Sequence, residues 1–257
     1  MFERMQKPFL TVETGEAYQP IRLTYHVADM DKLVAQLNSL KCIEKHPSGN
    51  WNWFWRDEVE EIHFESLDTF QRSSQNTVRL GTFAIRDDQL YLNLPSFKRA
   101  CLAVPFFHQV IDPAIAQIQH ADFLNKVYGQ DERLPHGFAE IFKDEELNAL
   151  LDQRIKEYNL VQQQCENAAS VEEAIALVTE YTNREANKKL PFAERYEFDL
   201  KPGQDADLIF LGFYIFLRGR ELVAIRRWFG ETSYTLADAT DEAIEQVFGD
   251  VGVDIIE

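Results

Sequence analysis

The sequence predicts an α+β fold: a mostly antiparallel sheet, or sheets, packed with helices, with a helical hairpin and a β-hairpin in the second half. Segments with an apolar residue at every second position are typical of half-buried strands, and they gather mainly in the first half. Long segments with amphipathic helical spacing follow in the second half. Because strands and helices are clustered rather than strictly alternating, this pattern favours α+β over a doubly wound parallel sheet.

The chain of 257 residues, 45% of them apolar, is long enough for one large domain or two small ones. We expect residues 1–128 to form an α+β domain or subdomain. Residues 129–257 are expected to add the helical hairpin and the β-hairpin, either as a second subdomain or as part of one continuous domain.

The first half reads as strands interrupted by two helices. Alternation predicts strands, and the predicted ones cover 21–27, 51–55, 61–65, 80–86 and 90–94, the last two forming a hairpin. Asp29 is suited to cap a helix that runs to Leu40, and Ser96 opens another helix. Pro105 is expected to kink or end that second helix, because it lacks the backbone N–H that bonds to residue 101. Residues 114–128 fit neither the helical nor the strand period, so no element is predicted there.

The second half begins with two predicted helices joined by about three residues, which should pack antiparallel. The first covers 144–167. The second opens at the capping box Ser170 to Glu173, and its inward-facing residues are expected to be Val171, Ala174, Ile175, Val178 and Tyr181. An irregular stretch, 182–206, is expected next.

The apolar segments 208–217 and 221–229 flank Arg218-Gly219-Arg220 and predict a β-hairpin. A short last helix is expected over 241–248.

The chain is strongly acidic, with 43 acidic and 26 basic residues and a net charge of −17. Residues 129–257 hold 27 acidic and 13 basic residues, so most of the excess lies there. Such a surface repels phosphates, which argues against direct binding of nucleic acid or anionic membranes and favours a basic protein partner.

Cellular location is predicted from three further features. The longest apolar run has ten residues, about half of the ~20 needed to span a bilayer. Three cysteines without a CxxC are typical of a reducing compartment, and the first residues lack an apolar leader. We expect a cytoplasmic protein that does not bind membranes.

The familiar motifs of cofactor and metal chemistry are absent. The sequence has no G-x-G-x-x-G, P-loop, G-x-S-x-G, HExxH or EF-hand pattern. We therefore predict no cofactor and favour a non-enzymatic protein.

Trp51, Trp53 and Trp55 alternate on one predicted strand, so all three point to one face of the sheet. Two interpretations are open. The rings form either a stacking platform for a ligand or the core of a two-layer domain, and we favour the core.

Glu61, His63 and Glu65 share one face of the predicted strand 61–65. Two carboxylates beside an imidazole can hold a divalent cation. A solvated outer sheet face would show the same residues, and we favour that interpretation, so no metal site is predicted.

Four arginines, Arg218, Arg220, Arg226 and Arg227, gather around the predicted second-half hairpin. Arginine binds phosphate or carboxylate in a bidentate manner, so these residues are candidate ligand-binding groups together with the three tryptophans. The alternative is pairing with nearby acidic side chains, and we favour it.

Two classes of function follow. The first is an acidic protein-binding or regulatory module, for example an inhibitor or immunity-type protein that faces a basic partner. The second is a small-molecule-binding protein or enzyme with a pocket between the tryptophan strand and the arginine-rich hairpin. Burial of the indoles and pairing of the arginines would favour the first.

Overall fold

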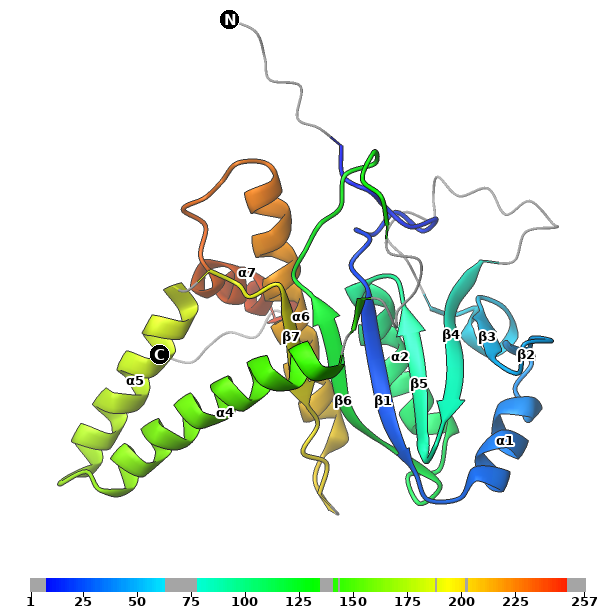
Figure 1. Ribbon diagram of the computed structural model, residues 1–257, viewed down its shortest axis with the longest axis horizontal. Coiled ribbons are helices and arrows are strands. Elements are labelled where there is room, and N and C mark those ends of the chain that lie inside the picture. The colour runs from blue at the N-terminus through cyan, green and yellow to red at the C-terminus, as the bar shows by residue number, and fades with distance from the viewer. Residues whose placement is uncertain are drawn as a thin grey trace, which may run out of the picture.

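A computed structural model describes residues 8–62, 78–134, 141–142, 144–187, 189–201 and 203–248. It confirms the α+β class: a seven-stranded antiparallel sheet, in the order β2-β3-β4-β5-β1-β6-β7, is packed with helices (Figure 1). The strands are β1 (Ile21–Val27), β2 (Ile43–Lys45), β3 (Trp51–Phe54), β4 (Arg79–Arg86), β5 (Gln89–Leu94), β6 (Ala116–Leu124) and β7 (Ala193–Glu197). The helices are α1 (Met30–Ser39), α2 (Phe97–Val110), α4 (Asp144–Glu166), α5 (Val171–Asn187), α6 (Ala206–Trp228) and α7 (Leu236–Phe248), with a short 3-10 turn, η1, at Asp57–Val59.

Strand β1 lies inside the sheet, between β5 and β6. Its apolar residues alternate and are buried, and Ile21 sits between Leu94 of β5 and Phe123 of β6. Because side chains of neighbouring strands in register share a face, each apolar position extends the same buried layer. The first-half hairpin β4–β5 is also confirmed, with Asp87 at positive φ in its tight turn.

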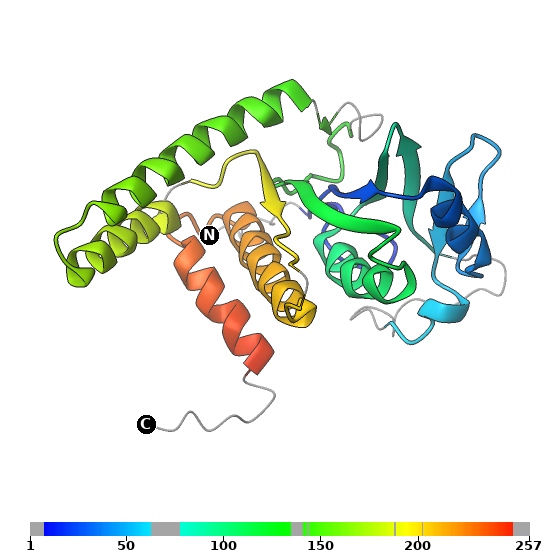
Figure 2. The same ribbon diagram turned by 90° about the horizontal axis from the view of Figure 1, so that it is seen from below.

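Helices α2 and α6 cover one face of the sheet, and α4 lies on the opposite side (Figure 2). Ser96 caps α2 as expected, since its Oγ accepts a hydrogen bond from Arg99 N at 3.2 Å. Pro105 does not end this helix, which continues to Val110. The next two residues, Phe106 and Phe107, pack on Trp53 of β3, and this anchoring offsets the single backbone bond that proline removes.

Residues 114–128 fit neither period because β6 contains a bulge. Tyr25 pairs with Ile118 and Thr24 with His120, so Gln119 is an extra residue in the register. A bulge of this kind shifts the alternation of every residue beyond it.

The expected β-hairpin of the second half is wrong: residues 208–217 and 221–228 belong to the single helix α6, which ends at Trp228. Its apolar residues do not form one stripe because it packs on two sides. Phe213 and Leu217 join the core under the sheet, whereas Leu222 and Val223 pack against α7. Gly219 is buried inside the helix, facing Leu236 and Thr240 of α7.

Helices α4 and α5 form the predicted helical hairpin, which projects away from the sheet (Figures 1 and 2). The capping box is present, because Ser170 Oγ accepts from Glu173 N at 3.2 Å and Glu173 Oε2 accepts from Ala169 N at 2.7 Å. The expected inward face of α5 is wrong: Val171, Ile175 and Val178 are exposed, while Ala174 and Tyr181 are half-buried.

The irregular stretch expected over 182–206 instead contains the end of α5 and strand β7. Strand β7 pairs with β6, so the second half completes the sheet of the first. The last helix, α7, begins at Leu236, five residues before the expected start.

Two buried ion pairs attach β7 to its neighbours. Arg195 pairs with Asp122 of β6 through Nε–Oδ1 and Nη2–Oδ2 distances of 2.5 and 3.1 Å. The adjacent Glu194 accepts from Arg220 of α6 at 2.6 and 3.2 Å. Since neighbouring residues of a strand face opposite sides of the sheet, one pair lies on each face.

Candidate functional site

The three tryptophans of the predicted site lie in the core. Trp51, Trp53 and Trp55 are 4%, 0% and 7% exposed, respectively. Trp51 Nε1 donates to Asn38 Oδ1 at 3.0 Å, and the ring of Trp53 stacks on Phe106. These are the contacts that the core interpretation expects.

The four arginines lie on α6, not on a hairpin. Arg218 pairs with Glu221 at 2.6 Å, and Arg226 with Glu231 and Glu242 at 3.2 Å each. Arg220, buried, pairs with Glu194 and lies over the Phe216 ring, 3.3 Å from its centroid.

Arg227 is half-buried, and no ion pair of its side chain is seen in the described part of the chain. The structure does not bring the arginines and the tryptophans together. Strand β3 is next to one edge of the sheet, and Arg220 contacts β7 at the other.

The acidic cluster of the first half is described only at its start. Glu61 lies in an exposed turn after η1, not in a strand, and His63 and Glu65 are outside the described residues. Among the described residues, no group of three or more His, Cys, Asp or Glu side chains is placed to hold a metal ion.

The helical arm, which we define as residues 153–184 of α4 and α5, has an unusual surface. No residue in this range whose side chain is described is buried. Three apolar residues of α5, Val171, Ile175 and Val178, are 71%, 60% and 49% exposed. Their i, i+4, i+7 spacing places them on one side of the helix, and we call them the α5 stripe.

Acidic residues lie near the α5 stripe. Helices α4 and α5 together (144–187) carry ten acidic and three basic residues, a net charge of −7, and the arm itself (153–184) carries five acidic and three basic residues, a net charge of −2. Glu172, Glu180 and Arg184 line the same shallow depression on α5 as Ile175. Hydrogen bonds from its own backbone N–H and from Ser170 hold the pKa of Glu172 below its usual value, so this carboxylate is charged at neutral pH.

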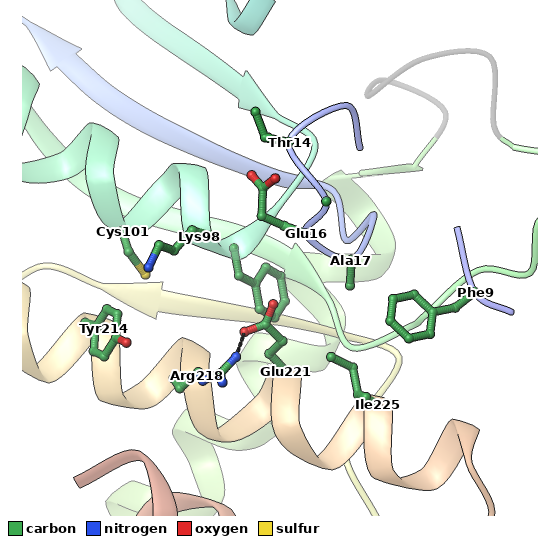
Figure 3. Close-up of a pocket in the computed structure, with 12 residues that line it drawn as sticks. Phe9, Thr14, Glu16, Ala17, Lys98, Cys101, Tyr214, Arg218, Glu221 and Ile225 are labelled. Carbon is green, nitrogen blue, oxygen red and sulfur yellow. Dashed lines mark hydrogen bonds and ion pairs between the residues drawn. The ribbon is translucent and has the colours of Figure 1, made fainter. Parts of the chain in front are cut away.

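A partly enclosed cavity of about 300 Å³ lies between the first turn of α2, α6 and the segment before β1 (Figure 3). Lys98 and Cys101 of α2 face Tyr214 and Arg218 of α6 across it. The other lining residues are Phe9, Thr14, Gly15, Glu16, Ala17, Phe97, Glu221 and Ile225. Burial, reinforced by the charge of Glu221, raises the pKa of the Cys101 thiol well above its usual value, so this group is not a thiolate nucleophile at neutral pH.

The cavity was not visible in the sequence, because its residues come from three separate segments. One feature of the sequence within α6 does point to the cavity. Tyr214, Arg218, Glu221 and Ile225 are spaced by four, three and four residues, which places them on one face of a helix.

Comparison of the chain with protein-family models, with curated proteins and with solved structures finds no match. None of the described helices is long and apolar enough to cross a membrane.

Proposed function

We propose that this protein is a protein-binding module, and that its helical arm binds a basic amphipathic helix of a partner protein. The observation that carries the proposal is the α5 stripe, an apolar row exposed within an acidic surface. Regulation or inhibition of a basic partner fits this arrangement. A cytoplasmic location is part of the proposal, supported by three free cysteines.

Burial of the α5 stripe against a partner would stabilise a complex. Leaving Val171, Ile175 and Val178 in water forgoes the free energy that burying them would release, about 25 cal/mol per Å². Scattered exposed aliphatic residues are ordinary, but a row at helical spacing is typical of a surface that receives a second helix.

The negative charge of the chain favours a basic partner over a second copy. A second copy of this chain would bring another net charge of −17 to an already acidic surface, and the two copies would repel. A partner with lysine or arginine beside its apolar face places opposite charges next to Glu172 and Glu180.

The proposal is tested with a fluorescent helical peptide that has leucines on one face and lysines on the other. A scrambled peptide of the same composition keeps the charge but loses the apolar face. We expect the amphipathic peptide to bind the whole protein more tightly in fluorescence anisotropy. The double variant Ile175→Gln, Val178→Gln should weaken binding by about tenfold, because two apolar contacts are lost.

Leu208→Gln is the matched control, since Leu208 is 67% exposed on α6, outside the arm. It should leave the affinity unchanged. Equal affinity for the scrambled peptide, or equal loss in both variants, would show that the α5 stripe is not the docking surface. Analytical ultracentrifugation of the free protein tests whether a second copy of this chain binds the α5 stripe instead. A dimer that dissociates in the double variant would show that the stripe binds a second copy and would contradict the basic partner.

A further inference from the structure

We propose that the cavity between α2 and α6 is a second binding site, which takes a small organic carboxylate with an apolar body. This inference is independent of the helical arm. It is carried by two cationic side chains, Lys98 and Arg218, that line facing walls of a cavity whose other walls are mainly apolar.

The two cationic side chains come from facing helices. Lys98 projects from the first turn of α2, and Arg218 and Tyr214 project from α6 (Figure 3). Lys98, Arg218 and Glu221 line the cavity together with Cys101. The first turn of a helix also favours anions, because its backbone N–H groups carry partial positive charge.

Arg218 is oriented before any ligand arrives. Its Nη1 donates to Glu221 Oε2 at 2.6 Å and its Nε to Gln246 Oε1 at 3.1 Å. A guanidinium fixed from two sides loses little conformational freedom on binding, which favours affinity for a carboxylate.

Two acidic residues line the cavity, Glu16 and Glu221; Glu221 pairs with Arg218, and Glu16 pairs with Arg99. Glu16 Oε1 accepts from Arg99 Nε at 3.4 Å and from Ser96 Oγ at 3.3 Å. Arg99, 1% exposed, also bonds to the Arg79 and Leu80 carbonyl oxygens. Arg99 also pairs with Glu13 at 3.3 Å, so Glu16 is paired with a buried cation that it shares with a second carboxylate.

The remaining walls define the body of the ligand. Phe9, Phe97, Ala17 and Ile225 present apolar surface. A volume of about 300 Å³ is at the small end of ligand sites, so it suits one ring or a short acyl chain rather than a nucleotide.

The test uses 3-phenylpropionate, its uncharged amide 3-phenylpropanamide, and inorganic phosphate, each titrated into the whole protein by calorimetry. We expect saturable binding of the carboxylate, with the amide and phosphate each weaker by about tenfold or more. Lys98→Gln should weaken carboxylate binding by about tenfold without affecting the fold, because Lys98 is only half-buried. Cys101→Leu should abolish it by filling the cavity without changing any charge.

Lys201→Gln, on an exposed lysine outside the cavity, is the matched control and should bind as the wild type does. Circular dichroism verifies that each variant is folded. Equal affinity for the amide, full binding by Lys98→Gln, or no saturable binding of the carboxylate would overturn the proposal. The double variant Ile175→Gln, Val178→Gln should bind 3-phenylpropionate normally, which separates failure of this site from failure of the arm.

Discussion

Replacing Arg195 with methionine is expected to lower the free energy of unfolding by about 3 kcal/mol, because it leaves Asp122 buried without its guanidinium partner. The Asp122 and Arg195 side chains are only 3% and 14% exposed, so water does not replace the lost contact. Urea unfolding at pH 7 measures the loss. The double variant Asp122→Asn, Arg195→Met should recover most of it, since the unpaired charge is then gone.

The same variant should change the pH dependence of stability. Burial alone raises the pKa of Asp122, but hydrogen bonds from His120 and Arg195 outweigh burial and hold it below its usual value. In the wild type this pair therefore stabilises the fold above the ordinary carboxyl pKa, and the contribution is lost as pH falls through the lowered value. In Arg195→Met the stability deficit should narrow as the pH falls below 7, because protonation of Asp122 relieves the unpaired charge.

Lys201→Met is the matched control for Arg195→Met. Lys201 pairs with Asp199 at 2.8 Å, but both side chains are mostly exposed. Water screens such a pair, so its loss should leave the urea midpoint unchanged. Equal losses in the two variants would contradict the assignment of Asp122 and Arg195 as a buried pair.

Trp53→Ala is expected to cost about 4 kcal/mol of unfolding free energy, because it removes the largest fully buried side chain of the described residues and leaves a cavity between β3 and α2. The Trp53 ring lies 5.0 Å from that of Phe107 and 6.0 Å from that of Phe106, centroid to centroid. Urea unfolding followed by circular dichroism measures the change. A loss below about 1 kcal/mol would place the ring at the surface, contrary to the structure.

Trp53→Phe separates packing from hydrogen bonding. The indole N–H of Trp53 is buried, and no acceptor for it is found among the described residues. Phenylalanine keeps most of the apolar contact and removes that N–H, so the cost should be well below that of alanine. Trp51→Phe is the comparison, because it removes a hydrogen bond to Asn38 and should cost more than Trp53→Phe.

Alternation in the sequence predicted the sheet of the first half because apolar residues occupy every second position of its strands, although in β1 the polar Arg22 and Thr24 are buried as well. Residues 21–27 and 90–94 show the period directly, and they pair in the structure. Strand β6 was not predicted, because its bulge interrupts the alternation of apolar and polar residues at Gln119.

Helix α6 could not be recognised from its apolar run, because a helix buried on two sides has the same composition as a buried strand. Because this segment was predicted as two strands, the cavity was not predicted either. Its α6 residues share one face only when the segment is helical. The arm was correctly predicted as a helical hairpin, but the α5 stripe was expected to be buried and is exposed. Periodicity shows that Val171, Ile175 and Val178 share a face, and it does not show whether this chain covers that face.

The proposal that the helical arm binds a basic partner is tested most directly by the association rate of the amphipathic lysine peptide at roughly 50 to 500 mM salt. The Debye length falls from more than about 10 Å to a few ångströms over this range, so salt screens the attraction between the peptide and the acidic arm. We predict that the rate falls by about tenfold or more, while the scrambled peptide remains the weaker ligand at every salt concentration. A rate that stays constant across the range would contradict a docking surface selected by charge.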